Sequence, residues 1–290
     1  MSGPERGAES IAQNVAEILN PGAHRPTLLV CEHAGVGVPE HLSGLYPDAL
    51  MRTHYGSDLG SRALTMALAE RLTTPAICAH YSRIVIDCNR RLDDPTLFLP
   101  SADGVSVAAN HSITASDREL RVRGIYAPLH ALVESQLETL AQRTHDLLYV
   151  AVHSFTPQLG DDPRPWDAGV MWDVDDRVAL GAADILRREN GLHIGLNEPY
   201  SGRAIQDFSV DFHAERQGFA NISIEIRQDH LSDASGVERW ADRLAGALEP
   251  FIDSPPSRLA TATEGGAPRF ATNAVEFLET AGTWGVQRAS

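Results

Sequence analysis

Four short apolar runs in this sequence end in side chains that can take part in chemistry. The first run is followed by Glu32 and His33, the third by His153, and the fourth carries Glu225 between two isoleucines. The second run ends in the polar residues 87–90 (DCNR), which bring a carboxylate, an amide and a guanidinium. Because ligands of open α/β sheets bind beyond the carboxyl ends of the strands, we expect these groups to meet at one sheet edge.

The two histidines suit a zinc site. Neutral imidazole is a preferred zinc ligand, and a catalytic zinc usually takes three protein ligands, so His33 and His153 need a third, for which a carboxylate is typical. Glu32 is adjacent to His33, but neighbouring strand residues point to opposite faces. Asp58 opens the next expected helix and could reach back to the metal. A negative charge at a helix N-terminus explains Asp58 equally well, and both interpretations stay open.

The hydrophobic spacing predicts strands that alternate with helices. This alternation predicts a single α/β domain with a mixed, mostly parallel sheet flanked by helices. The expected strands cover residues 27–31, 75–81, 83–87, 147–152, 170–172 and 221–226. The expected helices cover residues 9–19, 57–72, 116–145, 176–190 and 235–252, with a break or kink at Pro128.

The composition changes after Asp253. Residues 254–273 are rich in Pro, Gly, Ala and Thr, which is typical of a tail or linker. We therefore expect a catalytic domain over residues 1–253 and a C-terminal tail over 254–290, with one helical turn near residues 273–280.

Charge and composition exclude some classes of function. The chain has 290 residues with 24 Lys and Arg against 39 Asp and Glu, a net charge of −15. Such an acidic chain lacks the basic face that general nucleic-acid binding needs. We see no run of the roughly 20 apolar residues that crosses a bilayer and no apolar signal segment. Three cysteines inside apolar runs fit a reducing cytoplasm, and the oligomeric state is left without a prediction.

Five short segments, in order, resemble the N-formylglutamate amidohydrolase family. The resemblance spans roughly residues 25–250, and it implies a fold like that of zinc carboxypeptidases and aspartoacylases, with one zinc ion per chain. The segments are 29–35 (LVCEHAG) followed by Pro39, 81–83 (YSR) with 87–90 (DCNR), 153–157 (HSFTP), 197–200 (NEPY) and 224–229 (IEIRQD).

The resemblance assigns roles to individual residues. It implies that His33 and His153 are zinc ligands and that Glu225 is the catalytic glutamate, which takes a proton from water and returns it to the leaving nitrogen. It implies that Asn89 and Arg90 hold a substrate carboxylate, for which a guanidinium has the right geometry.

One departure concerns the carboxylate ligand. Carboxypeptidases use His-x-x-Glu, whereas the third residue after His33 is Val36. Asp58 matches an acidic residue that resembles the substitute ligand in the formylglutamate family.

The remaining candidates surround these residues. On this resemblance, Arg83 would stabilise the oxyanion of the tetrahedral carbon. Tyr200 and Arg203 are expected to line the pocket. Asp87 is expected to contact a metal ligand or to pair with an arginine rather than to bind the metal itself. His213 falls in a segment that resembles the family, but its surroundings favour a histidine on a surface helix.

The resemblance implies a zinc amidohydrolase that removes an N-formyl or small N-acyl group from an acidic amino acid. N-formyl-L-glutamate, which yields formate and L-glutamate, is the first candidate. A metallocarboxypeptidase or an aspartoacylase-like deacylase is the alternative within the enzyme class. A nucleophilic Cys31 beside His33 is disfavoured, because adjacent strand residues face apart. A non-catalytic carboxylate-binding protein is the alternative from another class; the only expected partner is a small N-acyl amino acid.

Overall fold

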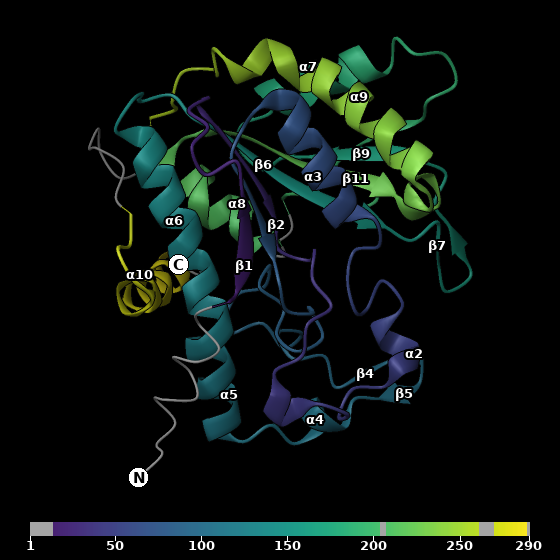
Figure 1. Cartoon of the computed structure of the whole chain (residues 1–290), viewed down its shortest axis with the longest axis vertical. Coiled ribbons are helices and arrows are strands. Elements are labelled where there is room, and N and C mark those ends of the chain that lie inside the picture. The colour runs from purple at the N-terminus through teal and green to yellow at the C-terminus, as the bar shows by residue number, and fades with distance from the viewer. Residues whose placement is uncertain (1–13, 204–206, 261–269, 289–290) are drawn as a thin grey trace.

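A seven-stranded sheet forms the centre of the computed structural model, which describes residues 14–203, 207–260 and 270–288 (Figure 1). Across the sheet the strands follow the order β1 (Ala16–Leu19), β3 (Ala76–Ala79), β2 (Thr27–Cys31), β6 (Leu148–Phe155), β11 (Ala220–Arg227), β9 (Ala168–Met171) and β10 (Ile194–Leu196). Two short hairpins lie outside the sheet: β4 (Ser101–Ala102) with β5 (Val105–Ser106), and β7 (Gln158–Leu159) with β8 (Asp162–Pro163).

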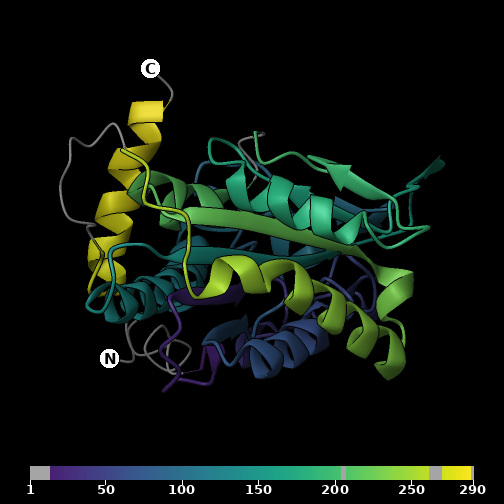
Figure 2. The same ribbon diagram turned by 90° about the horizontal axis from the view of Figure 1, so that it is seen from above.

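The sheet is mixed but mostly parallel. Strands β3, β2, β6 and β11 run parallel to one another, whereas β1 joins β3 and β9 joins β11 in antiparallel pairs. The long strands β6 and β11 run side by side through the middle of the molecule (Figure 2). The residues of β2 and β6 are buried throughout, as expected for parallel strands covered on both faces. The predicted α/β class and sheet type are confirmed.

Helices cover both faces of the sheet and close one hydrophobic core on each. One core contains residues of α3 (Ser61–Leu72), α7 (Arg177–Leu186) and α9 (Ala234–Ile252). The other contains residues of α6 (Ala127–Ala141), α8 (Phe208–His213) and α10 (Ala274–Arg288). The shorter elements are η1 (Glu40–Leu42), α2 (Asp48–Met51), α4 (Ala108–His111), α5 (Ala115–Arg121), the π-helical η2 (Val122–Tyr126), η3 (Glu215–Gln217) and η4 (Gln228–Leu231).

Strand alternation decides which side chains reach the site. In β6, Val150 and Val152 pack with α3, α7 and α9, whereas Tyr149 packs in the core beneath α6 and α8. Because successive strand residues point to opposite faces, His153 leaves β6 on the same face as Tyr149. The same rule places Glu225 of β11 opposite Ile224, which belongs to the first core.

Two predicted elements are wrong. Residues 83–85 form a turn, and residues 86 and 87 have no regular structure. Ser82 accepts hydrogen bonds from the backbone that follows it, and Asp87 N donates to Leu97 O. The apolar side chains of residues 84–86 are buried, which is why the run resembles a strand. The helix predicted over 9–19 is also wrong where the structure describes it, because Ala16–Leu19 form the edge strand β1 paired with β3. Residues 9–13 lie outside the described residues.

The long helix predicted over residues 116–145 is interrupted. It consists of α5, the π-helical η2 and α6, and Pro128 lies in the first turn of α6. Proline has no backbone N–H to donate to the preceding turn, so the regular hydrogen bonding changes just before it. The irregularity expected at Pro128 is therefore present as a π-helical segment just before it, and the chain stays helical through Pro128.

Part of the predicted C-terminal tail is packed against the core. Phe277 of α10 is fully buried, and the backbone N–H of Ala271 donates to Glu134 Oε2 on α6 at 2.9 Å. Figure 2 shows the yellow α10 standing beside α6 at one side of the molecule. In the part of the chain that the structure describes, no helix is long and apolar enough to cross a membrane.

Candidate metal centre and catalytic site

Three potential metal ligands meet beyond the carboxyl ends of β2 and β6. His33 comes two residues after β2, and His153 is the sixth residue of the neighbouring parallel strand β6. Asp58 lies three residues before α3, and its backbone N–H donates to His33 O at 3.0 Å, which ties the two loops together. The side chains that the sequence predicts at one edge of the sheet thus form one compact group.

The group has the geometry of a metal-binding site. His153 Nδ1 lies 2.9 Å from Asp58 Oδ2, and His33 Nδ1 lies 3.4 Å from the same oxygen without a hydrogen bond. One ligand atom from each residue lies within 4.8 Å of the others, and all three residues are buried. Two imidazoles with one carboxylate are the donor set of many catalytic zinc sites, and the unpartnered Nδ1 of His33 fits a ligand role.

A second carboxylate faces the Nε2 atom of each histidine ring. Asp87 Oδ1 contacts His33 Nε2 at 2.7 Å, and Glu32 Oε2 lies 3.5 Å from His153 Nε2. Carboxylates in this position fix the tautomer and orientation of metal-binding histidines. Glu32 also accepts a hydrogen bond from Tyr149 Oη at 3.2 Å. Glu32 therefore lies at Nε2 of His153, whereas Asp58 lies at Nδ1. Asp58, and not Glu32, is the carboxylate that joins the two histidines as a potential metal ligand.

Charge neighbours set the protonation of these buried groups. Burial works to raise the pKa of Asp58, but His33, His153 and Arg83 outweigh it and hold the pKa below its usual range. Burial likewise opposes ionisation of Asp87, and the charges of Arg83 and His33 hold its pKa well below its usual value. Both carboxylates are thus anionic at neutral pH, the state that cation binding needs.

Glu225 faces the same space from β11. It pairs in register with His153 across the parallel strands, and it is 6% exposed. Burial raises the pKa of Glu225 to about 8, the nearby Asp58 adds to the shift, and His153 and Arg83 oppose it. Glu225 Oε2 has no hydrogen-bond partner among the described residues. A carboxyl group with a pKa near neutrality is suited to take up and release a proton.

Arg83 spans the two anionic aspartates. Its guanidinium donates to Asp58 Oδ1 at 3.1 Å and to Asp87 Oδ2 at 2.7 Å. The pair with Asp87 agrees with the expected arginine contact of that carboxylate. The two aspartates thus hold the guanidinium at the cavity wall, beside the candidate metal ligands.

Asn89 and Arg90 line the same cavity, and each is hydrogen-bonded to its surroundings. Asn89 Nδ2 donates to Asp207 Oδ1 at 3.1 Å, and Asn89 Oδ1 accepts from Ser209 N at 2.9 Å. Arg90 Nε donates to Thr96 Oγ1 at 3.3 Å. These contacts hold both side chains at the cavity wall.

A cavity of about 340 Å³ connects these groups. Eight of the nine candidate residues line it, namely His33, Asp58, Arg83, Asn89, Arg90, His153, Tyr200 and Glu225. Arg203 is exposed and is not among the described residues of the wall; its guanidinium lies 5.9 Å from the Trp172 ring. Sequence reasoning missed the wall residues His54 and Asp207, because both lie in loops that no strand-end pattern marks.

Two other residues take on different roles in the structure. The surface interpretation of His213 is wrong: the ring is fully buried, with Nδ1 2.7 Å from Glu134 Oε1 and Nε2 2.9 Å from His130 Nδ1. Cys31 donates to Ser61 Oγ at 3.2 Å, and burial raises the pKa of its thiol well above the usual value. A nucleophilic cysteine needs the opposite shift.

Comparison with known protein families identifies the relationship. Residues 25–232 match the family described as N-formylglutamate amidohydrolase. This chain belongs to the N-formylglutamate amidohydrolase family. The match covers every candidate site residue, and membership places the chain among the amidohydrolases.

Solved structures support the fold of this N-formylglutamate amidohydrolase family member. The gene product Atu2144 from Agrobacterium tumefaciens has 24% identity and a TM-score of 0.78, over 83% of this chain and 98% of the other. An N-formylglutamate amidohydrolase from Ralstonia eutropha JMP134 has 20% identity and a TM-score of 0.63, over 80% of this chain and 95% of the other. A comparison with curated proteins gave no match.

Proposed function

We propose that this protein is a zinc-dependent amidohydrolase that removes an N-formyl or small N-acyl group from an acidic amino acid. N-formyl-L-glutamate, hydrolysed to formate and L-glutamate, is the first substrate. The observation that carries the proposal is the buried group of His33, Asp58 and His153, with Glu225 beside it on the adjacent strand. We assign the catalytic domain to residues 1–253, with α10 of the C-terminal segment packed against it. We assign the protein to the cytoplasm, in keeping with three buried free cysteines.

One zinc ion per chain would be held by His33, Asp58 and His153. A zinc ion in such a site supplies a Lewis acid, which lowers the pKa of water towards about 7 and polarises a carbonyl group. Asp87 and Glu32 keep the two imidazole rings oriented, through their contacts with His33 Nε2 and His153 Nε2. Burial of the three ligands excludes bulk water and strengthens their interaction with a cation.

Glu225 carries the proton in this mechanism. It accepts a proton from the attacking water and delivers it to the amide nitrogen as the carbon–nitrogen bond breaks. In the metal-free protein burial raises the pKa of Glu225 to about 8. A zinc ion beside it would favour the anionic carboxylate and lower this pKa towards neutrality, where the side chain can both receive and release the proton. Arg83, fixed by Asp58 and Asp87, provides positive charge where the oxyanion develops.

Asn89 and Arg90 bind the α-carboxylate of the amino acid in this proposal. A guanidinium can form two parallel hydrogen bonds to a carboxylate. Asn89 keeps one amide N–H beyond its bond to Asp207. The alternative substrates carry larger N-acyl groups, as in aspartoacylase-like enzymes. They require the same carboxylate-binding residues, Asn89 and Arg90, and differ only in the size of the acyl group.

A substrate screen tests the proposal. Metal-free protein is incubated with N-formyl, N-acetyl and longer N-acyl derivatives of glutamate and aspartate, with and without added zinc. Released formate or acid and free amine are both measured. The proposal expects zinc-dependent release, fastest for a formyl group on glutamate. Equal rates without metal would contradict zinc dependence, and absence of free amine from every compound would contradict amidohydrolase activity on this class.

A further inference from the structure

Arg164 is a buried cation beside the cavity. It follows the β7–β8 hairpin and is 7% exposed. Its guanidinium lies 4.7 Å from the centroid of the Tyr200 ring and 5.9 Å from that of Phe155, two rings that line the cavity. Among the described residues, no carboxylate lies within 4.0 Å of Arg164, although a buried charge is costly without a partner.

Arg83, which lines the same cavity, differs from Arg164 because it has carboxylate partners. Its guanidinium forms ion pairs with Asp58 and Asp87. Among the described residues, the guanidinium of Arg164 has one hydrogen-bond partner, Tyr200, whose Oη accepts from Arg164 Nη1 at 2.7 Å. The positive charge of Arg164 therefore lies beside Tyr200, a residue of the cavity wall, without a carboxylate partner among the described residues.

Two hydrogen-bond donors face the cavity near this charge. Tyr200 Oη accepts from Arg164, so its own proton is available to a different acceptor. His54 lines the same cavity, and its buried Nε2 has no hydrogen-bond partner among the described residues. Burial lowers the pKa of His54, the charge of Asp103 opposes this shift, and the charges of Arg83 and Arg164 add to it. The ring is therefore neutral and can donate from one nitrogen.

We propose that His54 and Tyr200 form a second carboxylate subsite, in which Arg164 is a positioning residue that supplies the balancing charge. Occupied by the side-chain carboxylate of the substrate, this subsite restricts the enzyme to N-acyl derivatives of dicarboxylic amino acids. The inference rests on the proposed function, because it assumes that the α-carboxylate and the scissile amide occupy the remainder of the cavity. Nothing in the motif pattern of the sequence marks Arg164 or His54.

The test compares N-formyl-L-glutamate with N-formyl-L-glutamine, which lacks only the side-chain charge. We measure kcat and KM of zinc-loaded wild type, Arg164→Met, Arg164→Lys and Tyr200→Phe. Wild type should prefer the glutamate compound by about 30-fold or more in kcat/KM, the range expected for a desolvated charge pair. In Arg164→Met this preference should largely vanish, because KM should rise far more for the glutamate compound than for the glutamine compound.

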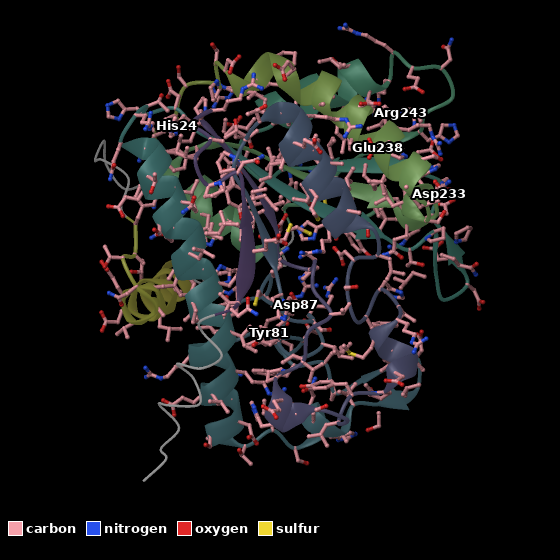
Figure 3. All side chains as sticks on the ribbon, in the orientation of Figure 1. His24, Tyr81, Asp87, Asp233, Glu238 and Arg243 are labelled. Atoms are coloured by element: carbon pink, nitrogen blue, oxygen red, sulfur yellow. The ribbon has the colours of Figure 1, made fainter. Side chains whose placement is uncertain are left out.

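A matched control separates this role from a structural one. Arg243 on α9 also stacks on an aromatic ring, with its guanidinium 5.1 Å from the Trp240 centroid, and lies far from Asp87 of the site (Figure 3). Arg243→Met should keep the full preference. Arg164→Lys should retain part of the preference for the glutamate compound. Tyr200→Phe should reduce this preference in kcat/KM about 10-fold, which corresponds to one hydrogen bond to a charged group. If Arg164→Met keeps the full preference for N-formyl-L-glutamate, or if wild type has no such preference, the proposed subsite is wrong.

The same comparison distinguishes the subsite from the proposed function. If wild type releases formate from neither compound, the proposed function fails, and calorimetric binding of the two compounds to the zinc-loaded protein decides the subsite. Tighter binding of the glutamate compound that is lost in Arg164→Met supports the subsite. Equal binding of both compounds, binding of neither, or a preference that persists in the variant contradicts it.

Discussion

Glu225 and His153 are register partners on the adjacent parallel strands β11 and β6. Both side chains leave the sheet on the same face, so the backbone hydrogen bonds of the sheet fix the distance between the candidate base and a candidate metal ligand. Asp58, in contrast, reaches His153 from a loop, with Nδ1 and Oδ2 2.9 Å apart. The rigid part of the site is thus set by the sheet, and the third ligand is supplied by the loop before α3.

The raised pKa of Glu225 predicts a pH-dependent stability of the metal-free protein. The folded state holds a proton on Glu225 up to a pKa of about 8, whereas the unfolded state releases it near 4.5. The contribution of Glu225 to the free energy of unfolding is complete below pH 4.5. It is lost as the pH rises to 8, by up to about 1.4 kcal/mol per pH unit. Denaturant unfolding from pH 4.5 to 8 should show wild type losing stability relative to Glu225→Gln. Parallel pH profiles for the two proteins would contradict the raised pKa.

Replacement of either histidine should remove the metal. His33→Ala or His153→Ala leaves only two ligands, so bound zinc after dialysis should fall from one per chain to near zero. Asp58→Ala should weaken zinc binding, because the loop carboxylate is replaceable by water. His24→Ala, at an exposed site remote from Asp87, is the control and should keep full occupancy (Figure 3). Full zinc occupancy in His153→Ala would contradict the ligand assignment.

Glu32 should tune metal affinity without binding the metal. Glu32→Gln keeps the size of the side chain but removes the negative charge 3.5 Å from His153 Nε2. Zinc affinity, measured by competition with a chelator, should fall about 10–100-fold, as for other partners of metal-binding histidines. Tyr149→Phe removes only the hydrogen bond to Glu32 Oε1 and should have a smaller effect. Identical affinities of wild type and Glu32→Gln would rule out this role.

Phe277 should stabilise the whole fold, although it lies in a segment whose composition predicts a tail. Its ring is fully buried, 4.9 Å from the ring centroid of His130 and 5.1 Å from that of Phe212. Phe277→Ala should lower the free energy of unfolding by about 3–5 kcal/mol, through lost burial and a cavity. Val275→Ala on the same helix is the control, because Val275 is 56% exposed and should change stability by less than about 0.5 kcal/mol. Equal effects of the two substitutions would show that α10 is not part of the core.

Sequence reasoning succeeded where one local pattern determines the outcome. Strand-end positions brought His33, His153 and Glu225 to one edge, because parallel strands deliver their carboxyl ends to the same place. It failed for the strand predicted over residues 83–87, because a short buried apolar run has the pattern of a strand even where it forms none. Ile84, Val85 and Ile86 are apolar and buried, but they pair with no strand among the described residues, and their segment makes turn and loop hydrogen bonds instead.

The missed parts of the cavity come from loops and long-range contacts. His54 and Asp207 reach the wall from segments without periodicity, and Arg164 is defined by its contact with Tyr200, 36 residues away. The edge strand β1 has the spacing of a helix, but pairing with β3 decides its conformation. Such contacts depend on tertiary packing, which hydrophobic spacing does not encode.

The turnover of Glu225→Gln tests the central claim most directly. This substitution keeps the size of the side chain and removes its ability to transfer a proton. In zinc-loaded protein acting on N-formyl-L-glutamate, kcat for formate release should fall about 10²–10⁴-fold, while zinc content stays at one per chain and the fold stays intact. A stable, zinc-loaded Glu225→Gln enzyme with near-normal kcat would contradict the assignment of Glu225 as the proton carrier of amide hydrolysis.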